Sequence, residues 1–175
     1  YRFRVHEADT THEAVDPYRF GQVLSDFDLH LLSEGTHYRA WEKLGPHRLT
    51  IDGVDGVHFA VWAPNAQRVS VIGDFNHWDG RAHPMRRLVP SGIWEIFVPW
   101  VAPGLPYKFE IVGSDGVRLP LKADPFARAS ELRPATASIV APELDHAWGD
   151  AAHREHWSIA DARRRLGADT VVQGN

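Results

Sequence analysis

The chain has 175 residues, a net charge of −4 with histidine counted as neutral, 43% hydrophobic residues and no cysteine. This length suits one domain with appendages, and the composition is that of a folded globular protein. The charge argues against nucleic acid or an anionic membrane as a partner, and the absence of cysteine excludes disulfides and thiolate metal sites. No apolar run is long enough to cross a bilayer and no signal peptide opens the chain, so the expected compartment is the cytoplasm.

The N-terminal third predicts a strand and then short helices. The first residues alternate like a strand without a following hairpin partner, so we expect residues 1–15 to be the end of a preceding β module. A helix is predicted after Ser25, an N-cap residue with acidic residues behind it, and it should end at Gly35. A second short helical segment covers 38–44, which makes 16–48 a helical linker.

From residue 49 onward the apolar period becomes two, and turn signals such as Asp52-Gly53 and Asp115-Gly116 separate the apolar runs. Strands are predicted at 49–51, 57–62, 68–72, 93–98, 107–112, 117–122 and 138–140. About seven short strands over roughly 95 residues are typical of an immunoglobulin-like antiparallel β-sandwich. The fold class is therefore predicted as mainly β, with the sandwich at 49–142 and short flanking helices.

The last segment, 143–175, is polar and mixed, and it is predicted to be a helical or disordered tail. Its residues Trp148 and Trp157 suggest docking to a neighbouring surface, and Trp41 is expected to dock the short helix onto the sandwich. Trp62, at the end of a predicted strand, is expected to pack in the core or at its rim.

The sequence offers no convincing candidate residues for catalysis or for metal binding. The sequence has no nucleophile elbow, phosphate loop or glycine-rich dinucleotide turn. His153 and His156 have i, i+3 spacing but lack a third ligand, so we interpret them as surface histidines. Acidic residues mostly lie in turns. We therefore expect no catalytic residue, no metal site and no cofactor in this chain.

The strongest local feature is the loop 73–80, which reads Gly-Asp-Phe-Asn-His-Trp-Asp-Gly and follows an apolar strand. The indole of Trp78 offers a flat apolar face that suits the C–H face of a pyranose ring, or it plugs the end of the sandwich. Lys108 lies on the polar face of a predicted strand, where it donates to sugar hydroxyls or is simply a solvated lysine beside Glu110. The residues alone leave both alternatives open.

A series of motifs in order resembles the N-terminal region of glycogen branching enzymes, the 1,4-α-glucan branching enzymes of the α-amylase superfamily. The matching runs are 16–21, 31–37, 41–45, 56–66, 73–80, 83–85, 91–95, 107–110, 121–126 and 133–138. Each run is a weak signal, but the whole series in order is specific, and it extends over about 16–157. Debranching enzymes and glycogen-sensing kinase subunits carry similar sandwiches, but runs 34–37 and 42–45 favour a branching enzyme.

The resemblance implies that the sandwich is a family 48 carbohydrate-binding module of the isoamylase N-terminal type. Its implied ligand is an α-glucan, glycogen or a maltooligosaccharide, contacted by Trp78 and Lys108, with a fainter implied contact at Ser138. We expect Asn76, in the same loop as Trp78, to form hydrogen bonds to the glucan as well. A second aromatic sugar contact of such modules would fall at 116–118, where this sequence has none.

The motifs of the catalytic barrel that follows this region in branching enzymes are missing from the sequence. We therefore expect a non-catalytic N-terminal fragment that binds glucan and positions it for the parent glycosyl transfer, α-1,4 cleavage with α-1,6 branch formation, in glycogen biosynthesis. Alone the chain should be inactive, and the parent's barrel is an implied partner. The alternative is a structural module that docks on the barrel and has no sugar affinity of its own.

Overall fold

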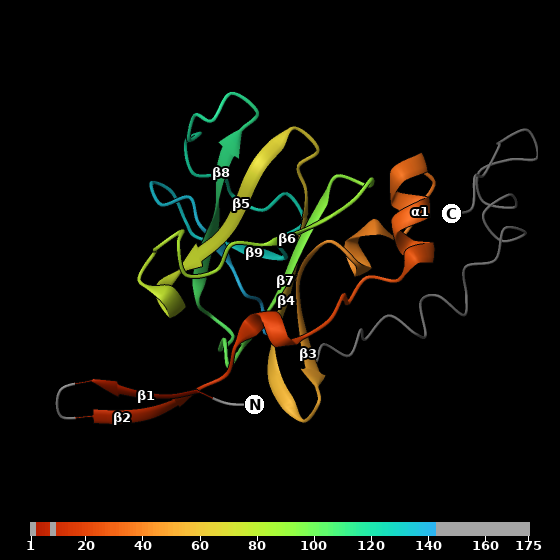
Figure 1. Cartoon of the computed structure of the whole chain (residues 1–175). Coiled ribbons are helices and arrows are strands. Elements are labelled where there is room, and N and C mark those ends of the chain that lie inside the picture. Colours follow the sequence, from red (N-terminus) through yellow and green to blue (C-terminus); the bar gives the residue numbers. More distant parts are fainter. Residues whose placement is uncertain (1–2, 8–9, 143–175) are drawn as a thin grey trace, which may run out of the picture. The chain divides into compact units, whose positions relative to one another are not determined.

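The computed structural model describes residues 3–7 and 10–142 (Figure 1). The predicted tail at 143–175, with Trp148, Trp157, His153 and His156, lies outside the described residues. Near the N-terminus, β1 (Phe3–Glu7) and β2 (Thr10–Ala14) pair as an antiparallel hairpin. The expected lack of a hairpin partner is therefore wrong, because the polar sequence of β2 hides its strand character. The assignment of 1–15 to a preceding module stays a prediction.

The predicted helix is confirmed. α1 (Asp26–Glu34) begins after Ser25, whose side chain accepts a hydrogen bond from a first-turn N–H, and it ends at Gly35 in the left-handed conformation. Two 3-10 turns flank it, η1 (Pro17–Arg19) and η2 (Ala40–Glu42). Trp41, in η2, is largely exposed rather than docked onto the sandwich. This part of the chain packs through buried leucines instead.

Two four-stranded antiparallel sheets form a sandwich, which confirms the mainly β, immunoglobulin-like prediction (Figure 1). One sheet has the order β3-β4-β7-β6 and the other β5-β8-β10-β9. The strands are β3 (Gly45–Ile51), β4 (Val54–Trp62), β5 (Ala66–Gly73), β6 (Arg86–Leu88), β7 (Ile93–Pro99), β8 (Pro106–Gly113), β9 (Ala129–Ser130) and β10 (Ser138–Ile139). The first of these begins at Gly45 rather than at residue 49.

One predicted strand does not form. Residues 117–122 contribute only isolated bridges, Arg118 to Val112 and Lys122 to Phe109. Pro120 lies between these bridges and has no N–H to donate, so a continuous ladder cannot develop there. Two observed strands, β6 and β9, are not predicted from the sequence, because they are short and lack an apolar alternation.

The core lies between the sheets, where inward side chains of β4, β5, β7 and β8 interdigitate. Its fully buried members include Phe59, Val71 and Phe109. The outer face of the β3-β4-β7-β6 sheet is covered by the N-terminal segment, with Leu24 and Leu44 packed in one cluster with sheet residues. The outer face of β5 and β8 is covered only in part: Ser70 and Ile72 are buried there as well, and the rest of the face is left for a surface site.

A buried polar pair fastens the N-terminal segment to that covered face. His58 Nε2 lies 3.0 Å from Glu95 Oε2, and the Glu95 carboxylate also accepts from the N–H groups of Val23 and Leu24. Burial alone would raise the pKa of Glu95, but these hydrogen bonds and the attraction of the imidazole lower it below its usual value. The carboxylate is thus stabilised in its ionised form.

Candidate functional site

Trp78 lies in the loop that leaves β5, and its conformation is unusual. Trp78 and His77 have φ angles of 59° and 54°, in the left-handed region that side chains other than glycine rarely adopt. The Trp78 N–H donates to Gly73 O at 2.9 Å, and its indole Nε1 donates to Asp74 Oδ1 at 2.7 Å. The residue is 37% exposed. Two successive strained residues thus hold an indole with a fixed polar edge at the surface, which is typical of binding loops.

Asn76 forms the frame of this loop. Its Oδ1 accepts from Gly73 N–H at 2.9 Å, and its Nδ2 donates to Val71 O and to His83 Nδ1, each at 2.9 Å. The residue is only 6% exposed. Both ends of the amide are engaged inside the protein, so the direct sugar contact predicted for Asn76 has no support in this arrangement.

Two glycines allow the loop to lie close to the sheet. A Cβ on Gly73 would stand 2.5 Å from Pro106 O, a backbone atom that cannot move aside. A Cβ on Gly80 would stand 2.3 Å from Glu110 Oε1. The loop therefore begins against β8 and returns over Glu110, and Trp78 lies between these two points of close approach.

Lys108 belongs to the same face. Its strand neighbours Tyr107 and Phe109 point into the core, so the Lys108 side chain points to the opposite face of β8, as predicted; it pairs in register with Ile72, the last residue but one of β5. Its Nζ donates to Thr136 Oγ1 at 2.7 Å, in an exposed position. The structure thus places Lys108 and the Trp78 loop on the same outer face, at the same end of β5.

Three charged residues extend this face, and no local pattern in the sequence predicts them as a group. The buried carboxylate of Glu110 accepts from Arg68 Nη2 at 2.7 Å and from Arg118 Nη1 at 3.2 Å. Glu110 is therefore held by the two arginines rather than standing beside Lys108. Alternation predicts that Arg68 and Glu110 point outward, but only the register of β5 on β8 shows that they meet.

These groups can stack on a ligand and donate hydrogen bonds to it. The outer face combines an aromatic ring, an ammonium, a hydroxyl and two guanidinium groups. Within residues 3–7 and 10–142, no cluster of three or more histidines or carboxylates could hold a metal ion. Ser138, the fainter expectation, is 1% exposed and accepts from Asp124 N–H inside the sandwich. It belongs to β10, and its side chain points into the sandwich rather than onto the outer face.

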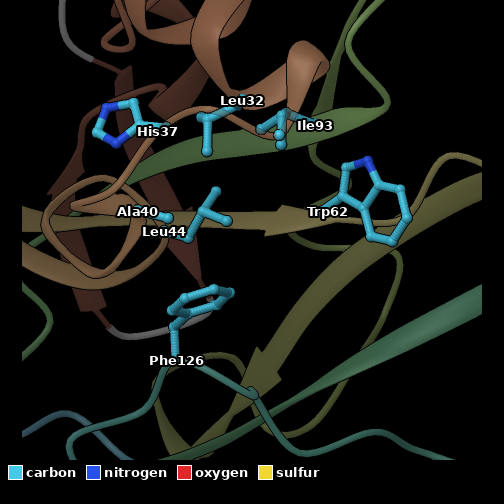
Figure 2. Close-up of a pocket in the computed structure, with 8 residues that line it drawn as sticks. Leu32, His37, Ala40, Leu44, Trp62, Ile93 and Phe126 are labelled. Atoms are coloured by element: carbon cyan, nitrogen blue, oxygen red, sulfur yellow. The ribbon is translucent and has the colours of Figure 1, made fainter.

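A second, apolar surface surrounds Trp62. This residue is 61% exposed, so the packing expected at the core or rim leaves most of its surface free. It lines a cavity of about 340 Å³. In Figure 2, Trp62 lies on the opposite side of this cavity from His37. The remaining lining residues come from α1, from the segment around η2, and from the sheet and the loop that follow: Leu32, Gly35, Ala40, Leu44, Ile93 and Phe126. Trp62 also borders a second hollow, of about 490 Å³, that reaches Leu119.

None of the helices in the described ranges is both long and apolar enough to cross a membrane.

Comparison with known proteins adds direct evidence on the family. Residues 43–127 match the family model of carbohydrate-binding module 48, the isoamylase N-terminal domain. The match includes both the Trp78 loop and Lys108.

The curated relatives extend the similarity over most of the chain. A 1,4-alpha-glucan branching enzyme GlgB of Mesorhizobium japonicum is 58% identical over 163 residues, which are 93% of this chain and 22% of the relative. The 1,4-alpha-glucan branching enzyme GlgB of Novosphingobium aromaticivorans is 57% identical over 86% of this chain and 21% of the relative. The chain therefore spans about a fifth of the length of these relatives.

Among solved structures, a pullulanase from Bacillus acidopullulyticus has a TM-score of 0.48 and 20% identity, over 77% of this chain and 14% of that chain. The family model and the curated relatives agree with the motif series found in the sequence. Through residues 43–127, the chain belongs to the carbohydrate-binding module 48 family, the isoamylase N-terminal domain.

Proposed function

We propose that this chain binds α-glucan, as glycogen or maltooligosaccharide, on the outer face of β5 and β8. The observation that carries the proposal is Trp78, an exposed indole held in a left-handed conformation with its Nε1 fixed by Asp74. A tryptophan fixed in this way presents its ring face without further ordering, which lowers the entropic cost of binding. Membership of the module family supports the same ligand class.

In the proposed complex, a glucose ring stacks its C–H face on Trp78. The Lys108 ammonium, which already donates to Thr136, donates its other protons to sugar hydroxyls. Arg68 and Arg118, oriented by Glu110, can donate to a further sugar unit along β8. One ring and a few exposed polar groups correspond to weak binding, on the order of 4–5 kcal/mol or a sub-millimolar Kd.

We further propose that this binding serves a longer parent protein. The curated relatives are branching enzymes of which the chain spans about a fifth, so the parent reaction would cleave an α-1,4 bond and form an α-1,6 branch. The module would hold the glucan near the parent's catalytic barrel, in the cytoplasm. The chain supplies binding and positioning, and the reacting groups belong to the parent.

Native affinity electrophoresis in gels with and without glycogen tests the proposal. The 175-residue chain should be retarded by glycogen, and Trp78→Ala should abolish the retardation without unfolding the protein. Trp100→Ala is the matched control, because Trp100 is also exposed, at 56%, and also has a φ of 59°. Equal retardation of wild type and Trp78→Ala, or none of either, contradicts the proposal. If Trp78→Ala unfolds the chain, Trp78 is a plug of the sandwich.

The apolar surface around Trp62 favours a second function, docking of the module on its parent. An indole that is 61% exposed between two hollows is a surface that a partner would cover. If docking is the main role, Trp62→Ala should abolish self-association or apolar dye binding of the isolated chain. Glycogen would then fail to retard the wild type, and Trp78→Ala would behave like the wild type in both assays.

A further inference from the structure

We propose that His83 is a positioning residue of the glucan site and makes glucan binding depend on pH, because its neutral imidazole holds the Asn76 amide that frames the Trp78 loop. The inference rests on the proposed function. His83 does not face the ligand. It lies behind the loop, in the segment 83–85. The carbonyl oxygen of His83 accepts from Val71 N–H, and Met85 N–H donates to Val69 O, so this segment extends the edge of β5.

The hydrogen bonds around Asn76 determine which atoms donate. Gly73 N–H can only donate, so the atom facing it must be the Asn76 oxygen. Val71 O can only accept, so the atom facing it must be the Asn76 nitrogen. The second proton of that nitrogen points to His83 Nδ1 at 2.9 Å. His83 Nδ1 must therefore accept, which requires a neutral imidazole with its proton on Nε2.

Protonation of His83 removes this acceptor. An Nδ1–H group would then face the amide protons of Asn76, and the two donors would repel each other. The Asn76 amide would have to turn, and it would give up its bond to Gly73 N–H or to Val71 O. Gly73 O is the acceptor for the Trp78 N–H, so a change at Gly73 reaches the strained residue directly.

The surroundings of His83 favour the neutral form. Burial lowers the pKa of His83 below its ordinary value of 6.5. Its ring also makes an edge contact with Phe75, with the centroids 5.9 Å apart. The titratable or charged side chains on this segment and on the elements packed against it are Asp74, His77, Asp79, Arg81, Arg86 and Tyr18, together with Arg68 of β5 and its partner Glu110. Among these, Asp79 and Arg81 pair with each other and Tyr18 donates to Pro84 O.

The direction of the pH effect follows from this shift. A histidine whose pKa is lowered by folding supports the folded loop fully above pH 6.5, and this support is lost as the pH falls through the lowered value. Loss of one buried hydrogen bond corresponds to about a fivefold to tenfold loss of glycogen affinity.

Three variants test the inference by glycogen affinity between pH 7.5 and the lowest pH at which circular dichroism shows a folded chain. His83→Asn places an amide oxygen near the position of Nδ1 and does not titrate, so its affinity should not change with pH. His83→Leu lacks the acceptor and should bind weakly throughout. His47→Asn is the matched control, since burial also lowers the pKa of His47, on β3, and its profile should follow the wild type.

A second readout needs no glycogen. The indole Nε1–H NMR signal of Trp78, assigned by its loss in Trp78→Phe, should move with pH in the wild type and remain constant in His83→Asn. The inference is overturned if the fall in affinity at low pH persists unchanged in His83→Asn. It is also overturned if the Trp78 indole signal depends on pH in the same way in the wild type and in His83→Asn. A chain that fails to bind glycogen at pH 7.5 refutes the proposed function instead, and the indole signal then still decides the role of His83.

Discussion

Trp78 donates its indole N–H to the carboxylate of Asp74, four residues earlier in the same loop, over 2.7 Å. This bond occupies the polar edge of the ring and leaves its faces as the surface that a ligand can use. Asp74→Ala should free the indole and weaken glycogen binding about threefold to tenfold, because the ring must then be ordered on binding. Asp74→Asn keeps an acceptor oxygen and should bind nearly as the wild type does. Affinity electrophoresis measures both, and unchanged binding in Asp74→Ala contradicts this role.

Lys108 should contribute through its charge and its donors. Lys108→Met retains most of the aliphatic stem but removes the ammonium that donates to Thr136, so glycogen affinity should fall about threefold to tenfold. The melting temperature should stay close to that of the wild type, because the group is at the surface. Lys122→Met, at an exposed lysine outside β8, is the control. If the two variants bind equally, Lys108 has no part in the site.

Gly80 should be intolerant of a side chain. Gly80→Ala would bring a methyl group against the Glu110 carboxylate, which the two arginines hold in place, and should lower the free energy of unfolding by about 1–3 kcal/mol. Gly21→Ala is the control, because nothing lies within 4 Å of its added Cβ. In urea denaturation, a Glu110→Ala background should relieve most of the Gly80→Ala penalty. An unchanged penalty there would show that the strain has another source.

The buried Glu95 carboxylate should make stability depend on pH. Its pKa is lowered by folding, so its contribution is complete above its usual value of 4.5 and is lost as the pH falls through the lowered value. Glu95→Gln should lower the free energy of unfolding at pH 7 by about 2–3 kcal/mol, since it removes charge-assisted bonds to His58, Val23 and Leu24. Urea denaturation from pH 7 to pH 3 should show a smaller pH dependence in the variant. Parallel wild-type and variant profiles would exclude Glu95 as the cause.

Local signals in the sequence were sufficient for several elements. Ser25 and Gly35 mark both ends of α1 because capping depends on the residues at the ends themselves. Asp52 and Gly53, both with positive φ, form the two-residue turn between β3 and β4 that this dipeptide predicts. The Trp78 loop stands out in the sequence as a candidate binding loop because a tryptophan among glycine, asparagine and aspartate is unusual.

Other features depend on contacts between distant residues, which local patterns do not contain. The predicted strand at 117–122 fails at Pro120. Arg68 meets Glu110 because of the register of β5 on β8, and Arg118 joins them through its bridge to Val112. Asn76 was predicted as a sugar contact because its polarity is visible in the sequence, but its burial is not.

The central claim is that α-glucan binds on the outer face of β5 and β8 at Trp78. The most direct measurement is an NMR titration of the 175-residue chain with maltoheptaose, observing the indole Nε1–H signals assigned by single Trp→Phe variants. The account predicts that the signal of Trp78 shifts in a saturable manner while those of Trp62 and Trp100 do not. A saturable shift at Trp62 with none at Trp78, or no shift at any indole, would contradict it.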